Sequence, residues 1–200
     1  MYTTNEYEKL SMEYGPCSSW AIWDENDQND TSVIDESVAQ LNTRYVFVGL
    51  NISKDLKKPS WSNFHGGQHD RKLMYACNND TKLRGSYLTD IFKYHANANA
   101  REVESYFHKH PEKIKKHADL FEKEMMDVKI GKDTVFITLG ADTSFLWRCF
   151  NEHFRDRIRC GKVVNIRHYA SRGTDEAWVN CLGKKLGIKK IEKWRKGKLK

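Results

Sequence analysis

The segment Tyr45-Val-Phe-Val-Gly49 is apolar and does not alternate between apolar and polar side chains. Three further short runs resemble it: Ser86-Tyr-Leu-Thr89, Val135-Phe-Ile-Thr-Leu139 and Lys162-Val-Val-Asn-Ile166. Short apolar runs of this kind, three of them rich in β-branched residues, are typical of strands that are covered on both faces. The four runs therefore predict a buried sheet of four strands.

Helical patterns lie between these runs. In the clearest, Pro111 takes a first-turn position and Gly131 is a stop signal, and the apolar residues recur on one face: Ile114, Ala118, Phe121, Met125 and Val128. Further helices are expected near residues 70–78, 142–154 and 174–186. Strands separated by helices predict βαβ units, and hence a three-layer α/β sandwich around a mainly parallel four-stranded sheet.

The chain has 200 residues, of which 39% are hydrophobic, which is enough for one domain with a core. We expect residues 41–186 to form that domain, residues 1–40 to be an acidic extension packed on it, and residues 187–200 to be a basic tail. No run approaches 18 apolar residues, so no membrane span is expected. The start lacks a secretory pattern, and five widely spaced cysteines indicate free thiols, which together favour a cytoplasmic protein.

Charge is distributed unevenly along the chain. The net charge is +7, although residues 1–40 carry nine acids against Lys9. The last seventeen residues carry eight lysines and Arg195 against Glu192. A basic middle and a basic tail suit a polyanion such as nucleic acid, and a solvated tail that only aids solubility is the alternative.

Ligands of open parallel sheets bind beyond the carboxyl ends of the strands. The residues that follow the four runs are therefore candidates for a site: Asn51, Asp90, Gly140-Ala-Asp142 and His168. Two strings stand out among them. The first is Gly49-Leu-Asn-Ile-Ser53, with Phe64 thirteen residues after Asn51, and the second is Arg167-His-Tyr-Ala-Ser-Arg172-Gly173.

In order, spacing and strand placement these strings resemble the uracil-DNA glycosylase superfamily, and its single-strand-selective monofunctional branch more than the others. The resemblance covers about residues 41–185. It implies a uracil-DNA glycosylase-like fold, and a monomeric enzyme that flips a deaminated or damaged base, uracil or a related one, out of DNA. Such an enzyme hydrolyses the N-glycosidic bond with no metal or other cofactor.

The resemblance also assigns roles to residues. Asn51 would position the hydrolytic water, and His168 would stabilise charge on the leaving base. Phe64 would stack on the base, with Gly49, Leu50 and Asp90 beside it. Arg172 would enter the duplex as a wedge, and Ser171 and Gly140 would lie near phosphates at helix starts.

This chain departs from the superfamily pattern in three places. Ile52-Ser53 replaces the usual Pro-Gly or Pro-Tyr, and Tyr169-Ala170-Ser171 replaces Pro-Ser-Pro, so the histidine loop has no proline to stiffen it. Asp90 stands where members specific for uracil have asparagine. An ionised aspartate only accepts hydrogen bonds, so it prefers a base edge that offers two donors.

Other interpretations remain open. Asn51 and Asp90 are also suited to capping turns, and Phe64 to the core. His65 and His69 are a possible metal pair or ordinary loop residues, and Cys160 with His168 is a possible thiol and base. The alternative function is a catalytically inactive superfamily relative that binds nucleic acid or a nucleotide. A hydrolase of another kind has no support from a Gly-x-Ser-x-Gly elbow or a P-loop.

Overall fold

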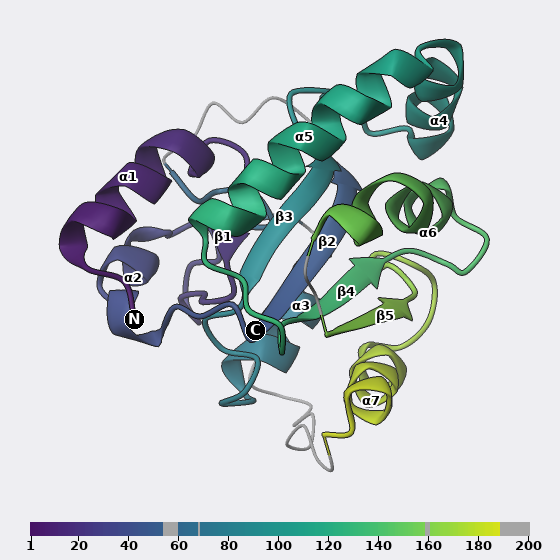
Figure 1. Cartoon of the computed structure of the whole chain (residues 1–200). Helices are drawn as coiled ribbons and strands as arrows, with labels where there is room; N and C mark the ends of the chain where they lie inside the picture. The colour runs from purple at the N-terminus through teal and green to yellow at the C-terminus, as the bar shows by residue number, and fades with distance from the viewer. Residues whose placement is uncertain (54–59, 68, 159–160, 189–200) are drawn as a thin grey trace.

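The computed structural model describes residues 1–53, 60–67, 69–158 and 161–188. Its centre is a sheet of five strands (Figure 1), which lie in the order β1 (Ser19–Trp20), β3 (Tyr87–Phe92), β2 (Tyr45–Asn51), β4 (Val135–Leu139) and β5 (Lys162–Ile166). Strands β2 to β5 are parallel, as the sequence predicts, and helices flank the sheet. Cys160 and the tail residues from 189 on, including Trp194, lie outside the described residues.

The predicted count of four strands is wrong, because β1 adds a fifth. Ser19 pairs with Leu88 and Trp20 with Tyr87, antiparallel to the rest of the sheet. Two residues are too few to produce a period-2 pattern, so the sequence carries no strand signal there. The strand forms because the completely buried Trp20 anchors this segment against Tyr87 and Trp61.

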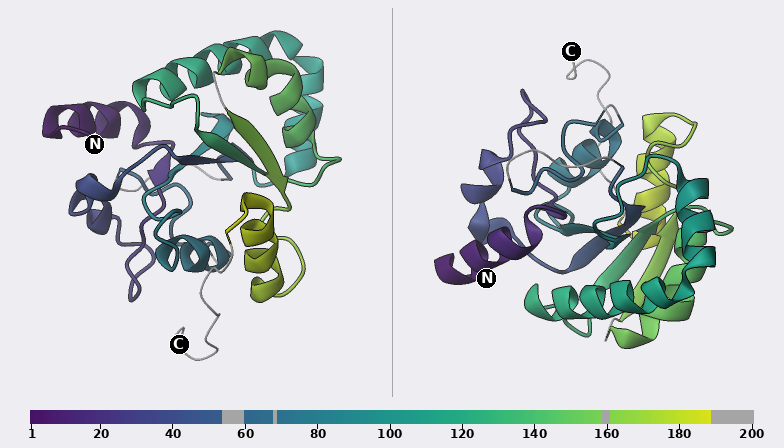
Figure 2. Two further views of the ribbon diagram at one scale, coloured as in Figure 1. Left: turned by 60° about the horizontal axis from the view of Figure 1, so that its bottom comes forward. Right: turned by 90° about the horizontal axis from the view of Figure 1, so that it is seen from above.

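The helices fall into two groups, one on each face of the sheet (Figure 2). One apolar cluster combines side chains of α1 (Thr4–Tyr14), α4 (Ala100–Lys109), α5 (Pro111–Asp127) and α6 (Phe145–Cys149) with Val46 and Val48 of the sheet. The other combines α3 (Arg71–Asn78) and α7 (Asp175–Leu186) with Phe47 and Ile137. The shorter helical segments are α2 (Ser32–Asp35), two 3-10 turns (Val38–Gln40 and Arg155–Arg157) and a π turn (Phe150–Phe154). No helix in the described ranges combines the length and apolar character that a membrane crossing requires.

Local sequence explains where the principal helices begin and end. Thr174 caps α7 by accepting a hydrogen bond from the Ala177 N–H, and Gly187 ends it in the left-handed conformation with φ of 69°. Pro111 begins α5 at its first turn, where a missing N–H costs nothing. Thr3 and Glu6 form a capping box at the start of α1.

A buried ion pair lies between β3 and α5. Lys93 Nζ is 2.7 Å from Glu124 Oε2, and the Glu124 side chain is completely buried. Three hydroxyl groups donate hydrogen bonds to Glu124 Oε1, from Ser18, Tyr87 and Thr89. These bonds satisfy a charge that would otherwise be costly in the core, and they tie the N-terminal segment to the sheet.

The order of the strands creates a crevice at their carboxyl ends. The chain passes from β2 to β3 on one side and then crosses to β4 on the other side of β2. The connections on the two sides of β2 therefore diverge and leave a crevice at its carboxyl end. Open α/β sheets bind ligands at such a crevice.

Candidate functional site

A cavity of about 740 Å³ lies at this crevice. Seven residues predicted from the sequence line it: Gly49, Leu50, Asn51, Phe64, Asp90, Gly140 and His168. They come from the ends of β2, β3, β4 and β5 and from the loop that follows β2. The fold therefore brings residues more than a hundred positions apart into one concave surface.

Asn51, at the end of β2, is held by its amide nitrogen. Its Nδ2 donates to the backbone carbonyl groups of Ile52, His95 and Asn97 at 2.8, 2.9 and 2.8 Å. These contacts determine which end of the amide is nitrogen. Within the described part of the chain Oδ1 accepts no hydrogen bond, so a fixed acceptor is available to a ligand or water in the cavity.

His168 follows β5, and its ring is held in one protonation state. Its Nδ1 accepts a hydrogen bond from the Ala170 N–H at 3.1 Å, and the ring stacks on Tyr169. Burial lowers the pKa of His168 to about 4, and the nearby His69 contributes in the same direction. The imidazole is therefore neutral at pH 7, and because Nδ1 accepts, Nε2 carries the proton and can donate it.

Phe64 forms part of the cavity wall in an unusual backbone conformation. Its φ is 65°, in the left-handed region that residues with a side chain rarely adopt. Trp23 Nε1 donates to the Phe64 carbonyl at 3.3 Å and helps to hold it there. The edge of the Phe64 ring approaches Gly49. A methyl group added to Gly49 would lie 3.4 Å from Phe64 Cζ. Strain of this kind is found at binding sites, where the surroundings enforce one side-chain position.

Asp90 is a buried carboxyl group beside Phe64. Its Oδ2 accepts a hydrogen bond from Asn63 Nδ2 at 2.8 Å, and only 3% of the residue is exposed. Burial raises the pKa of Asp90 to about 6, while the hydrogen bond from Asn63 and the charge of Lys93 act in the opposite direction. Asn63 was not among the predicted site residues; its position directly before Phe64 was the only available signal.

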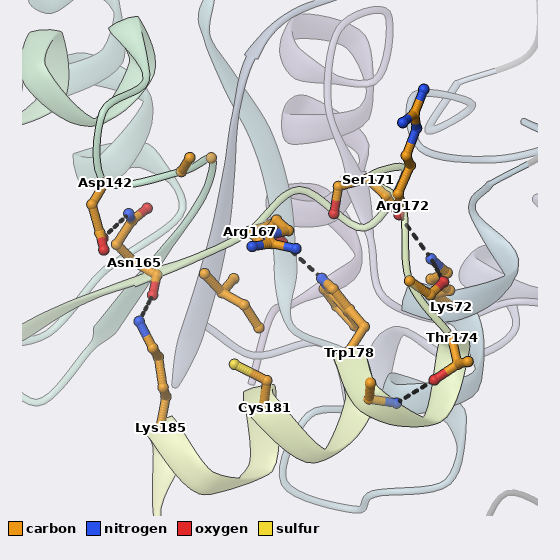
Figure 3. A pocket seen from close by; sticks show the side chains of 15 residues that line it. Lys72, Asp142, Asn165, Arg167, Ser171, Arg172, Thr174, Trp178, Cys181 and Lys185 are labelled. Carbon is orange, nitrogen blue, oxygen red and sulfur yellow. Dashed lines mark hydrogen bonds between the residues drawn. The ribbon is translucent and has the colours of Figure 1, made fainter.

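The loop from residue 168 to residue 173 lacks prolines, yet two contacts hold it and a third holds Arg167, the residue before it. Lys72 Nζ, on α3, donates to the carbonyl groups of Ser171 and Gly173 at 3.3 and 3.4 Å. Trp178 Nε1, on α7, donates to the Arg167 carbonyl at 2.7 Å (Figure 3). Sequence reasoning missed Lys72, because only the fold shows that α3 lies against this loop.

Ser171 and Arg172 do not line the cavity. They line a second pocket of about 350 Å³, which Gly140 also borders, between the histidine loop and α7 (Figure 3). Arg167 and Lys185 add two exposed cationic side chains to this pocket, and Arg172 extends away from α7. The residues predicted for the base and for catalysis thus line the cavity, whereas Ser171 and the predicted wedge Arg172 line an adjacent pocket, and Gly140 borders both.

The histidines near Phe64 do not form a metal centre with carboxylates or thiols. Across the described ranges, no group of three or more His, Cys, Asp or Glu side chains is placed to hold one ion. His65 is buried and stacks on Trp23, with ring centroids 4.8 Å apart. It packs on Trp23 and, like His69, also lines the cavity.

The fold and the cavity together define an α/β protein with a cavity at the carboxyl ends of a mainly parallel sheet. No known family model, curated protein or solved structure matches this chain.

Proposed function

We propose that this protein is a DNA glycosylase that removes a deaminated or damaged base by hydrolysis. The observation that carries the proposal is the meeting of Asn51, Phe64 and His168 in one cavity, in the chemical states that the reaction needs. The resemblance of their sequence strings to the uracil-DNA glycosylase superfamily supports the same function.

The reaction requires a base to leave the helix and enter the cavity. Extrusion costs a few kcal/mol of stacking and pairing, and stacking on Phe64 offsets part of that cost. The bond between C1′ of the sugar and the base nitrogen then breaks, and its electron pair stays with the base. A water molecule donates a hydrogen bond to Asn51 Oδ1 and its oxygen bonds to C1′. The proton that this water loses passes, directly or through solvent, to the departing base anion, which leaves as the neutral base.

His168 suits the stabilisation of the leaving base. A neutral imidazole with its proton on Nε2 donates a hydrogen bond to a developing anion and remains correctly protonated across the physiological range. Asn51 is a weak base, so its contribution is the orientation of water and not early proton removal.

DNA would contact the protein around the second pocket. Arg167, Arg172 and Lys185 are exposed there, next to the cavity, and cationic side chains bind phosphates with a salt-dependent affinity. A basic surface directly beside a cavity large enough to admit a base is the arrangement that a base-flipping enzyme needs.

The test is base release from oligonucleotides, measured by alkaline strand scission in the presence of EDTA. Substrates are single- and double-stranded and carry uracil, hypoxanthine, xanthine, 8-oxoguanine, which keeps the amino group of guanine, or no lesion. We expect wild-type protein to release a base, Asn51→Ala to lose about 100-fold or more of the rate, and His168→Ala to lose about 100- to 1000-fold. Asn26→Ala and His153→Ala, at exposed positions outside the cavity, serve as matched controls and should retain the wild-type rate.

Two outcomes would contradict the proposal. Release that continues in Asn51→Ala would place the chemistry elsewhere or in a contaminant. Failure of the folded protein to act on any of these substrates, combined with salt-dependent DNA binding, would favour the non-catalytic nucleic-acid-binding relative.

A further inference from the structure

The Asp90 carboxyl group has no part in bond cleavage, although it lines the cavity. A buried carboxylate without a cation is costly, and Lys93 does not compensate it directly. The Lys93 ammonium group donates to the backbone carbonyl of Asp90 at 2.8 Å and pairs with Glu124. Among the described residues, the hydrogen bond from Asn63 is the only one that the carboxylate accepts.

The Asp90 carboxylate and the edge of the Phe64 ring lie close together over Gly49. Gly49 and Asp90 face one another in register on β2 and β3. A methyl group added to Gly49 would lie 2.1 Å from Asp90 Oδ1 and 3.4 Å from Phe64 Cζ. The carboxylate oxygen and the ring edge are therefore both next to one point above Gly49, and all three residues line the cavity.

Asn63 leaves the carboxylate free to accept more hydrogen bonds. Its Nδ2 spans Asp90 Oδ2 and the Cys17 carbonyl, and its Oδ1 accepts from the Phe64 N–H at 3.1 Å. The amide is thus fully engaged and holds Asp90 and Phe64 in a constant relation. Among the described residues Oδ1 of Asp90 accepts no hydrogen bond, and Oδ2 accepts one of the two that its lone pairs allow.

We propose that Asp90, positioned by Asn63, makes the cavity select a base edge with two adjacent donors, a ring N–H beside an exocyclic amino group. The 2-amino-6-oxopurine and 2-amino-4-oxopyrimidine rings have this edge, and it fits a carboxylate with two parallel hydrogen bonds. Uracil presents one N–H between two carbonyl groups, whose lone pairs face the carboxylate unfavourably. The inference rests on the proposed function in taking the cavity as a base pocket, but it does not require catalysis.

The experiment compares two free bases, isocytosine and uracil, which differ at one ring position by an amino group in place of a carbonyl. Each is titrated into the full-length protein at pH 8, where the Asp90 carboxyl is ionised, and binding is followed by NMR chemical shifts. We expect wild-type protein to bind isocytosine about 10- to 100-fold more tightly than uracil. Asp90→Asn should lose that preference, because an amide offers a donor as well as an acceptor.

Two further variants sharpen the result. Asp133→Asn makes the same chemical change at an exposed carboxyl group outside both pockets, and it should keep the wild-type preference. Asn63→Ala retains the charge of Asp90 but releases its orientation, so it should show a reduced preference. Thermal unfolding of each variant shows whether it is folded, and Asp90→Asn can still accept the hydrogen bond from Asn63.

Equal binding of the two bases, a preference for uracil, or no binding of either base by wild-type protein would overturn the inference. So would an unchanged preference in folded Asp90→Asn. A failure of this inference can be distinguished from a failure of the proposed glycosylase function. Base release that depends on Asn51 without the isocytosine preference refutes only the inference, and selective binding without release from any oligonucleotide refutes only the glycosylase.

Discussion

Gly49 and Asp90 face one another on neighbouring strands so closely that residue 49 has no room for a side chain. An added methyl group would lie 2.1 Å from Asp90 Oδ1. We expect Gly49→Ala to displace the carboxylate, to destabilise the protein by about 1–3 kcal/mol through overpacking, and to weaken base binding strongly. Urea unfolding and the base titration measure the two effects.

Gly131→Ala is the control for this change, because nothing lies within 4 Å of an added methyl group there. It should leave the free energy of unfolding and base binding close to wild type. Base binding by Gly49→Ala equal to that of wild type would mean that Asp90 does not contribute to the cavity as described.

Lys72 is expected to stiffen the loop of residues 168–173, which contains no proline. Lys72→Met removes the hydrogen bonds to the Ser171 and Gly173 carbonyl groups but preserves the aliphatic part of the side chain. A looser loop positions His168 less well, so the rate of base release should fall about 10-fold or more, as misplacement of catalytic groups does. Arg71→Met is the control, because Arg71 pairs with the same Asp175 as Lys72 does. Equal losses in the two variants would implicate Asp175 and not the loop.

The lowered pKa of His168 predicts an acid-sensitive fold. The unfolded chain binds a proton on this histidine near pH 6.5, but the folded chain does so only near pH 4. Stability from this group is therefore complete above pH 6.5 and is lost as the pH falls toward 4. In His168→Phe, the slope of the free energy of unfolding against pH in this window should be smaller, by at most about 1.4 kcal/mol per pH unit. His153→Phe, at an exposed position, provides the comparison, and an equal change in both variants would contradict the assignment.

The ion pair between Lys93 and Glu124 should be sensitive to the loss of either partner. Lys93→Met leaves the Glu124 carboxylate buried without a cation, and we expect a loss of about 3–5 kcal/mol in urea unfolding. Lys123→Met removes a surface ammonium group that pairs with Glu13 and Asp127, and it should cost no more than about 1 kcal/mol. Similar losses for the two variants would show that the buried pair is not a major contact.

The central strands and the principal helices could be predicted from the sequence because their signals are local. Runs such as Val135–Leu139 have the composition of buried strands, and Pro111 indicates the start of a helix. β1 could not be predicted, since its two residues form a strand only through pairing with Tyr87 and Leu88. Helix α4 likewise lay outside the predicted segments.

The site residues at or near the carboxyl ends of strands could be predicted from the sequence, because those ends lie together at one edge of a parallel sheet. Asn51, Asp90 and His168 line one cavity for that reason. The residues that hold them were not predictable. Lys72 acts on a loop about a hundred residues away, and the carbonyl groups that fix Asn51 belong to a segment after the next strand.

The wall of the cavity is assembled from segments that stretch from Gly49 to Ala170. No fragment of the unfolded chain can reproduce it, so a molecule that occupies it binds the native state alone. Such a molecule raises the melting temperature by mass action, with about 2.7 kcal/mol of added stability at a concentration 100 times its Kd. A calorimetric screen of nucleobases, nucleosides and short oligonucleotides can therefore find what this protein recognises without assuming any reaction.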